Sequence, residues 1–579
     1  MTSPILDTLP VLVIDCQTTG ATPDRGHLLE IGWATVVAKE CRTRDEIPIN
    51  THLVQLPEGV DIPRPIRRLT GITPESLSDA HSPARVWAQL SRAAGRPAPG
   101  IGTMGCPAVI HYARFETPFL RRLHQAHAPE VPFPFDIICT HEIAVRLLPE
   151  LPRRGLRALA GYIGRPIGEL KRSADHVQAT ARLWVQFVKQ LRRHYDITRL
   201  GDLRRWLSEP ADRCKGGRVY PMPESARLSL PPEPGIYRMH RGNGDVLYVG
   251  KARSLRSRVN SYFRKKARHP EHILEMLTQA KDISLDVTGT ALEAALAEAD
   301  EIKHLSPPYN RALRDGNRSL CYTVKDFSNV SPEPTGAFTV GPFPSERIPI
   351  ALAEIRRAIE GGTVAARPAA VLGFSPEFAP DPDVFSDGVD RFKIRHDDDL
   401  CAGHLHRALM RIGRRLWQER HCVPEEPDAD ASLSCDASED RDEEEWEWDP
   451  ERVADMMEGI LVHAGHLIRR ARWLCQLQEA TIAWGPDEDP RLLHVLILEK
   501  GAPAGYRILA GGQSVPVPRG YLRKMALRRA RFDTATYDRL RVLTTELRRL
   551  VREGRSVVVR VSPSVSLGSK TIARLLQWV

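Results

Sequence analysis

The sequence lacks any long hydrophobic run, and it has few aromatic residues. No stretch approaches the roughly 18 consecutive apolar residues that a membrane span needs, and the first 30 residues have neither the basic start nor the apolar segment of a signal peptide. The ten cysteines are scattered along the chain without the compact spacing of a disulfide framework. These absences exclude a membrane protein and a disulfide-stapled secreted domain, and they predict a soluble cytoplasmic protein with reduced thiols.

What is present is a long and unevenly charged chain. Its 579 residues are too many for one hydrophobic core, so the sequence predicts several domains. The net charge of +9 favours a polyanionic partner. Ten Lys or Arg residues and one acid lie between Arg238 and Arg268, whereas residues 425–449 hold thirteen acids and one base. The basic surplus is therefore local.

The pattern of apolar residues predicts an α/β protein with several domains. Strand-like segments at 11–14 and 28–37 alternate with helix-like segments at 115–124 and 179–192, which is typical of an α/β layer fold. A proline-rich stretch at 216–234 indicates a linker. We expect seven parts: a first domain at 1–200, a linker at 201–231, a small α/β domain at 232–315, an extension at 316–390, a helical segment at 391–422, an acidic linker at 423–450, and a C-terminal α/β or α+β region at 451–579.

Two short strands in the small domain each carry a tyrosine. Gly235-Ile236-Tyr237 begins one strand, Gly242-Asn243-Gly244 suits a tight turn, and Val246 to Gly250 forms the return strand. Pairing of these strands is expected to bring Tyr237 and Tyr248 nearly opposite one another on a common face. Their hydroxyls would then meet one substrate atom.

Further polar residues follow this hairpin. Ser254 is a plausible N-cap of a helix through Phe263, on which Arg258 and Tyr262 share a face at positions i and i+4. Lys251 precedes that helix within reach of the same site. Thr290 is expected to cap a second helix that carries Glu298, and Asn310 closes the unit.

These residue types suit the cleavage of a phosphodiester bond, which requires a nucleophilic water, relief of phosphate charge and a stabilised leaving oxygen. We expect Glu298 to bind Mg²⁺ or Mn²⁺, and Lys251 and Arg258 to neutralise phosphate charge. A tyrosine would act as base or position the water, although a tyrosine pKa of about 10 suits a base only when nearby cations lower it. Nearby basic residues are expected to contact DNA: Arg253, Arg256, Arg264, Lys265 and Lys266.

Residues 232–313 resemble the GIY-YIG nuclease domain, and in detail that of the excinuclease C family. The similarity lies in GIY at 235–237, YVGKA at 248–252, LRSRVNSYF at 255–263, EAALAEADEIK at 293–303 and PPYN at 307–310. The resemblance implies a site made of Tyr237, Tyr248, Gly250, Lys251, Arg258, Tyr262, Glu298 and Asn310.

Residues 8 to about 195 resemble the DEDDh 3′–5′ exonucleases, which implies an RNase H-like fold. The similar segments include IDCQTTG at 14–20 and HYARFETPFL at 111–120. This family holds two metal ions with four carboxylates and uses a histidine as base. Asp15 is retained, but the other family positions are occupied by Gln17, Glu116, Lys171 and His176. Loss of carboxylates there removes charge that two dications need, so we expect a degenerate, inactive site.

The sequence thus predicts a metal-dependent DNA endonuclease. By resemblance, it would act in bacterial nucleotide excision repair, cut on the 3′ side of a lesion, and work with DNA and other excision-repair proteins, without a membrane partner. Two alternatives remain: a 3′–5′ exonuclease that uses the first domain, and a non-catalytic DNA-binding scaffold. Gln17, Lys171 and His176 argue against the exonuclease, and the intact tyrosine, arginine and glutamate set argues against the scaffold.

Overall fold

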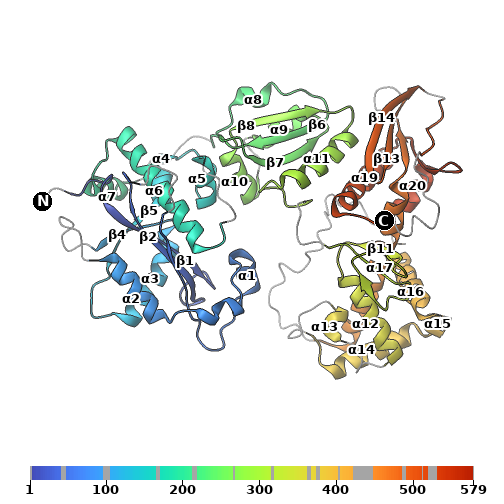
Figure 1. Ribbon diagram of the computed structural model, residues 1–579, viewed down its shortest axis with the longest axis horizontal. Helices are drawn as coiled ribbons and strands as arrows, with labels where there is room; N and C mark the ends of the chain where they lie inside the picture. The colour runs from blue at the N-terminus through green and yellow to red at the C-terminus, as the bar shows by residue number, and fades with distance from the viewer. Residues whose placement is uncertain are drawn as a thin grey trace. The chain divides into compact units, whose positions relative to one another are not determined.

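The computed structural model divides the chain into two compact units, residues 1–294 with 307–311, and residues 295–306 with 312–579. Figure 1 colours the chain from blue to red in sequence order. The described residues are 3–40, 47–95, 105–164, 170–210, 218–264, 268–313, 319–361, 367–372, 379–401, 404–421, 448–485, 491–510, 513–518 and 531–577. No helix in these ranges combines the length and apolar character that a bilayer span requires.

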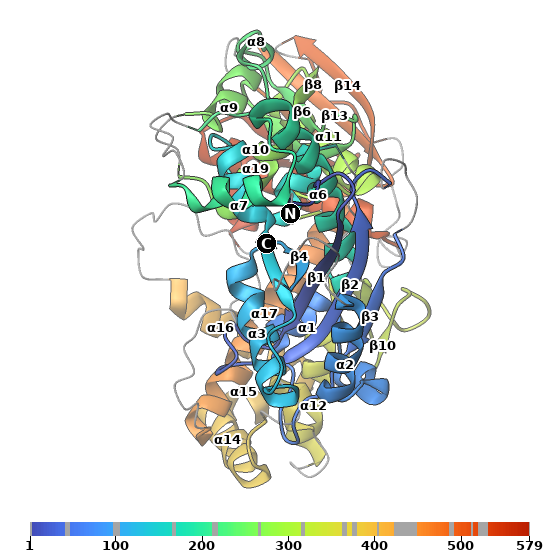
Figure 2. The same cartoon turned by 90° about the vertical axis from the view of Figure 1, so that its left-hand side faces the viewer.

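The first domain is built on a five-stranded mixed sheet in the order β3-β2-β1-β4-β5. Strands β2 and β3 extend β1 in antiparallel pairs, and β4 and β5 run parallel to it. Figure 2 shows β1, β2 and β3 side by side. The strands are β1 (Pro10–Thr18), β2 (Leu28–Val37), β3 (Asn50–Leu53), β4 (Cys106–Ile110) and β5 (Phe135–Cys139).

Alternation along β1 sends apolar side chains to both faces of this sheet, so two cores form. Val11 and Val13 pack in one core with residues of α4, α6 and α7, whereas Leu12 and Ile14 pack in the other with α2 and α3. The domain therefore has three layers. Its helices are α1 (Arg64–Thr70), the 3-10 helix η1 (Pro74–Asp79), α2 (Pro83–Ala94), α3 (Ala113–His127), α4 (Thr140–Leu147), α5 (Leu156–Tyr162), α6 (Ser173–Tyr195) and α7 (Leu200–Ser208).

The expected α/β layer fold is confirmed, but the expected linker at 201–231 is not a plain connection. It contains α7 and the short helix α8 (Glu224–Leu228). Leu200 and Leu203 are buried in the core beside α6, because α7 presents an apolar face to it. The first domain thus continues to about Ser208.

The second domain of this unit has a three-stranded antiparallel sheet in the order β7-β6-β8. Tyr237, Met239 and Leu247 pack with helices α9 and α10 in its core. Gly235 faces the next strand closely, since a Cβ there would overlap the carbonyl oxygen of Asp286. The elements are β6 (Gly235–His240), β7 (Val246–Ala252), α9 (Leu255–Ser261), α10 (Glu271–Gln279) and β8 (Asp282–Val287). They are followed by α11 (Ala291–Leu305), which belongs to the other unit from Ala295 on.

After α11, the other unit contains a small sheet, β10-β9-β11, and a helical core. Phe343, Leu352, Phe385, Leu409 and Met457 belong to one buried cluster, so the expected parts at 316–390 and 391–422 share a core with the start of 451–579. Most of the expected acidic linker lies outside the described residues. The elements are β9 (Cys321–Thr323), β10 (Val330–Ser331), β11 (Val340–Phe343), α12 (Arg347–Gly361), α13 (Pro368–Leu372), α14 (Pro382–Arg395), α15 (Asp397–Cys401), α16 (Leu405–His421) and α17 (Pro450–Leu477).

The chain ends in a five-stranded sheet in the order β14-β13-β12-β15-β16, antiparallel throughout. The strands expected at 493–498 and 557–561 are β13 and β15. The sheet differs from that of the first domain because β15 runs antiparallel to β12. Its elements are β12 (Thr481–Trp484), β13 (Leu492–Glu499), β14 (Ala502–Ala510), α19 (Thr534–Arg552), β15 (Val557–Ser562), β16 (Val565–Gly568) and α20 (Ser569–Leu576).

Candidate active site

The hairpin of β6 and β7 brings two tyrosine rings together. Tyr237 pairs with Gly250 and Tyr248 pairs with Met239, so both tyrosines project from the same face of the sheet. Their ring centroids are 6.1 Å apart and the rings are tilted by 42°. The common face is confirmed, but Tyr237 lies opposite Gly250, two residues along β7 from Tyr248, and a one-residue register shift between Met239 and His240 contributes to this offset.

Gly250 allows this arrangement. A Cβ on Gly250 would lie 2.5 Å from the hydroxyl oxygen of Tyr237 and 2.8 Å from Cε1 of Tyr248. The ring of Tyr237 therefore lies over a residue that has no side chain, and Tyr237 is fully buried. Tyr248 is partly exposed. In this structure Tyr248 can thus meet a substrate directly, whereas the buried hydroxyl of Tyr237 cannot.

Helix α9 adds a third tyrosine and an arginine. Ser254 is its N-cap, as expected, and its side-chain oxygen accepts a hydrogen bond from the backbone N–H of Ser257. The hydroxyl oxygens of Tyr237 and Tyr262 are 3.0 Å apart, and Arg258 donates to the Tyr262 hydroxyl at 3.2 Å. The shared face of Arg258 and Tyr262 is therefore confirmed, and the two form a continuous polar chain with Tyr237.

The surroundings of these side chains shift the pKa values of Tyr237 and Arg258. Burial, and then the neighbouring Tyr262 and Tyr248, raise the pKa of Tyr237 well above its usual value. Burial opposes the charge of Arg258, but the tyrosine oxygens around it outweigh burial and raise the pKa of its guanidinium. At neutral pH Tyr237 is therefore a neutral hydrogen-bonding group and Arg258 a cation.

Asn310 fixes the edge strand that carries Tyr248. Its side-chain oxygen accepts the N–H of Val249 at 2.9 Å, and its side-chain nitrogen donates to the carbonyl of the same residue at 2.9 Å. The side chain thus replaces a neighbouring strand at this point of β7. The preceding residue, Tyr309, donates its backbone N–H to Leu247 at 3.1 Å. Tyr248 is held from both sides.

The remaining expected residues lie in different settings. Lys251 pairs with Ile236 and so leaves β7 on the face opposite to the tyrosines, because successive strand residues alternate in direction. Glu298 is partly exposed on α11, whose start is capped by Thr290 as expected. Arg256 donates to the carbonyl of Leu230 at 2.6 Å, which gives it a structural role as well. Arg253 and Arg264 are exposed, and Lys265 and Lys266 lie outside the described residues.

The expected degenerate site of the first domain is internally paired. Asp15 receives a hydrogen bond from Gln17 at 2.9 Å on one carboxylate oxygen and contacts Nδ1 of His176 at 3.1 Å with the other. Burial lowers the pKa of His176, but the charge and the hydrogen bond of Asp15, together with the carbonyl of Leu170, outweigh burial, so the net pKa is raised. Gln17 and His176, which occupy positions of family carboxylates, therefore both contact Asp15, the carboxylate that is retained. Lys171 is exposed just before α6.

Glu116 is buried beside this pair. Burial, followed by the charge of Asp15, raises its pKa well above the usual value. Burial also lowers the pKa of nearby His111 to about 3, with a contribution from His141. Within the described residues, no group of three or more His, Cys, Asp or Glu side chains has the arrangement of a metal site.

Sequence reasoning missed the contacts that surround both sites. Glu30, which is buried, accepts hydrogen bonds from Arg172 at 2.9 Å and from the backbone N–H of Ser173 at 2.8 Å, and so anchors the start of α6. His269 lies over the ring of Tyr262, with centroids 5.9 Å apart. These partners are distant in sequence or separated by irregular loops, so no periodic pattern reveals them.

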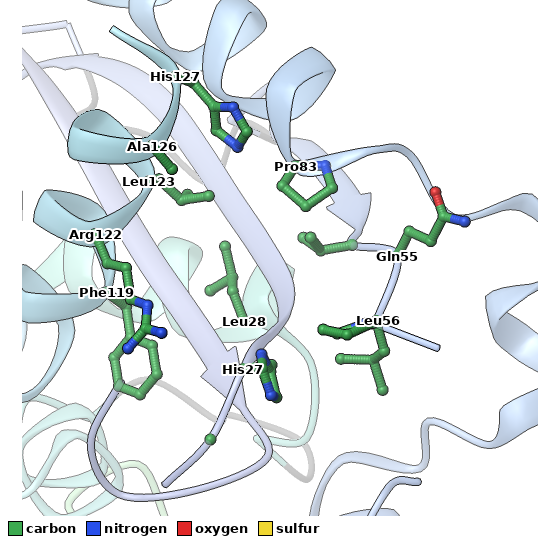
Figure 3. Close-up of a pocket in the computed structure, with 13 residues that line it drawn as sticks. His27, Leu28, Gln55, Leu56, Pro83, Phe119, Arg122, Leu123, Ala126 and His127 are labelled. Carbon is green, nitrogen blue, oxygen red and sulfur yellow. The ribbon is translucent and has the colours of Figure 1, made fainter. Parts of the chain in front are cut away.

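The first domain also contains a pocket of about 310 Å³, shown in Figure 3. Leu28, Phe119 and Leu123 form apolar walls, and His27 and His127 lie among the lining side chains. The thirteen lining residues include none of the expected site residues, so this pocket is separate from the chemistry described above.

Comparison with known proteins supports the two resemblances. Residues 233–311 match the family described as the UvrC-like GIY-YIG domain, and residues 12–183 match the exonuclease family. UvrABC system protein C of Acaryochloris marina is 46% identical over 101 residues, which are 17% of this chain and 16% of that protein. This chain therefore spans a small part of the length of that relative.

Two solved structures are also similar to parts of the chain. The GIY-YIG N-terminal endonuclease domain of UvrC from Thermotoga maritima, bound to magnesium, is 32% identical and covers 15% of this chain and 99% of that chain, with a TM-score of 0.14. Exonuclease X in complex with 5′ overhanging duplex DNA is 20% identical and covers 31% of this chain and 91% of that chain, with a TM-score of 0.23. On the family matches, this chain joins an exonuclease-family domain to a UvrC-like GIY-YIG endonuclease domain that follows it.

Proposed function

We propose that the chain is a divalent-metal-dependent DNA endonuclease that acts through its GIY-YIG domain in nucleotide excision repair and incises the 3′ side of a lesion. One observation carries the proposal. The Arg258–Tyr262–Tyr237 chain of polar contacts lies beside the partly exposed Tyr248, on a strand that Asn310 holds in place. This arrangement offers the cation of Arg258 and the accessible hydroxyl of Tyr248 to one phosphate.

Each residue has a distinct part in the proposed reaction. Arg258 neutralises charge on the phosphate, and Tyr248 holds the attacking water in line. Tyr237 keeps its proton, because its pKa is raised, and it orients Tyr262 instead of acting as the base. Lys251 adds positive charge from the strand end, and Arg253, Arg256, Arg264, Lys265 and Lys266 contact the DNA backbone.

Glu298 is the residue that we assign to the metal ion. Carboxylate oxygens are ligands of the kind that Mg²⁺ and Mn²⁺ take, and this side chain is partly exposed, so an ion and its water ligands can reach it. When bound, such an ion polarises the phosphate and lowers the pKa of the attacking water.

The exonuclease-family domain is inferred to be non-catalytic. A two-metal site needs several negative carboxylates, but here Asp15 is paired with His176 and Gln17, and burial raises the pKa of Glu116. With Gln17 and His176 in place of two carboxylates, too little negative charge remains for two dications. The proposed partners are DNA and other excision-repair proteins, by analogy with the UvrABC system proteins that the GIY-YIG domain is similar to.

The test is cleavage of end-labelled duplex DNA, with and without a bulky lesion, in Mg²⁺ or Mn²⁺. We expect internal nicks on the 3′ side of the lesion that Glu298→Ala abolishes and that Asp15→Ala leaves intact. Both replacements remove one carboxylate, so they are matched. A ladder from the 3′ end that disappears in Asp15→Ala would assign the chemistry to the first domain and refute the proposal.

A further inference from the structure

The two nuclease-related domains meet through α5 of the first and α10 of the second, which lie side by side (Figure 1). The backbone N–H of Arg153 donates to the Thr278 hydroxyl at 3.1 Å, and the guanidinium of Arg153 contacts Glu271 at 3.3 Å. The ammonium of Lys281 lies 4.8 Å from the ring centroid of Tyr162. Thr278 is fully buried, so this contact is a packed interface and not a loose tether.

At the centre of the interface, Gly161 packs directly on the side chain of Gln279. A Cβ on Gly161 would overlap the carboxamide of Gln279 and would stand 2.8 Å even from its Cγ. Gln279 is fully buried. Because that side chain is enclosed, its position depends on the surface that α5 presents.

Gln279 is part of a polar network that leads to the active site. Its carboxamide oxygen accepts from Nε of Arg241 at 3.0 Å, and its nitrogen hydrogen-bonds to the hydroxyl of Tyr309. The Tyr309 hydroxyl donates to Glu275 at 2.6 Å, and Glu275 lies 3.7 Å from Nε of Arg157 in the first domain. Residues of both domains therefore fix the position of the Tyr309 side chain.

Tyr309 and Asn310 are adjacent, and together they bind β7 on both sides of Tyr248. The Tyr309 N–H binds the carbonyl of Leu247, and the Asn310 side chain binds both backbone groups of Val249. A shift of Tyr309 would therefore move the strand segment that presents Tyr248.

We propose that the exonuclease-family domain is a positioning module for the nuclease, and that α5 sets the place of Tyr248 through Gln279 and Tyr309. Tyr309 is thus a positioning residue that acts without touching the substrate. The expected effect on DNA cleavage rests on the proposed endonuclease function, whereas the expected effect on the position of β7 does not.

Gly161→Ala in the full-length chain tests this coupling. Alanine favours a helix more than glycine does, so the change supports α5 itself while it displaces Gln279. Gly155→Ala is the matched control, because Gly155 lies at the start of the same helix and a Cβ there meets nothing within 4 Å. Tyr309→Phe removes only the hydroxyl at the other end of the path, and it serves if Gly161→Ala fails to fold.

We expect hydrogen exchange at the amides of Val249 and Tyr309 to become about tenfold faster in Gly161→Ala and in Tyr309→Phe. Both changes disturb the contact between Gln279 and the Tyr309 hydroxyl, which holds residues 309–310 against β7. The kcat for DNA cleavage should fall by roughly 100-fold with little change in KM, as expected when a catalytic group is displaced by about 1 Å. Gly155→Ala should match the wild type in both measurements.

The two measurements separate the possible failures. If exchange at Val249 and Tyr309 is unchanged in both variants, the coupling does not exist. If exchange rises but kcat stays at the wild-type level, the coupling has no catalytic role and the proposal is overturned. If the wild-type chain cleaves no DNA, the endonuclease assignment fails, and the exchange data still decide whether α5 holds the strand.

Discussion

Gly250 lies directly against the phenol of Tyr237, because the two residues face each other across β6 and β7. The space between the strands is so limited that a methyl group on Gly250 would stand 2.6 Å from Cζ of that ring. The glycine of the YVG motif is therefore explained by packing, and not by a turn.

Gly250→Ala is expected to displace Tyr237 and Tyr248 together. Overpacking of this kind costs about 1–3 kcal/mol of unfolding free energy, and the shift of Tyr248 should lower kcat for DNA cleavage by roughly 100-fold. Thermal unfolding and steady-state cleavage measure the two effects. Wild-type activity in Gly250→Ala would show that the close packing of the tyrosines is dispensable.

Tyr262→Phe tests the hydrogen bond to the Tyr237 hydroxyl, because the phenylalanine ring should keep Tyr237 buried. The change removes the hydroxyl that joins Tyr237 to Arg258, and so leaves the buried Tyr237 hydroxyl without that partner, at a cost of about 1–3 kcal/mol. We expect kcat to fall at least tenfold. Tyr220→Phe is the control, since Tyr220 packs on Phe263 in the same core. Equal activity of the two variants would contradict a role for the Tyr262 hydroxyl.

Local parts of the site were predictable from the sequence because they depend on neighbouring residues. Ser254 and Thr290 cap their helices, Arg258 and Tyr262 meet at i and i+4, and the two tyrosines share a face of the hairpin. Each follows from the period of a helix or strand, which a single segment determines.

The rest of the site depends on contacts that no single segment encodes. The one-residue register shift after Met239 helps to place Tyr248 diagonally to Tyr237, and the burial of Tyr237 requires Tyr262 and Gly250 to close over it. Alternation along β7 turned Lys251 to the other face. The contact of Gly161 with Gln279 joins two domains, and its signal in the sequence is one glycine within a short helix.

The first domain gives a prediction about pH. The pKa of Glu116 is raised on folding, so the stability that depends on it is fully present below the unfolded pKa of about 4.3 and is lost as pH rises through the folded pKa. Glu116→Gln, which cannot ionise, should therefore have a higher urea midpoint of unfolding than the wild type at pH 7, and the difference between the two midpoints should be smaller at pH 4.

The control for this comparison is Glu142→Gln on α4, where the side chain is exposed and its replacement should change little. If Glu116→Gln is destabilised at pH 7, the carboxylate is charged in the folded protein, and the exonuclease-family site is less degenerate than proposed.

Metal binding gives the sharpest contrast between the two domains. In the GIY-YIG domain Glu298 is a partly exposed carboxylate, whereas in the first domain Asp15 is already bound by His176 and Gln17. An ion at Asp15 must displace the side chains of His176 and Gln17, which costs the energy of two partly buried contacts. Titration with Mn²⁺, followed by electron paramagnetic resonance, should therefore give a site that Glu298→Gln weakens at least tenfold and that Asp15→Asn does not change. If Asp15→Asn weakens binding and Glu298→Gln has no effect, the metal belongs to the exonuclease-family domain, and the pairing of Asp15 with His176 would have to open when the ion arrives.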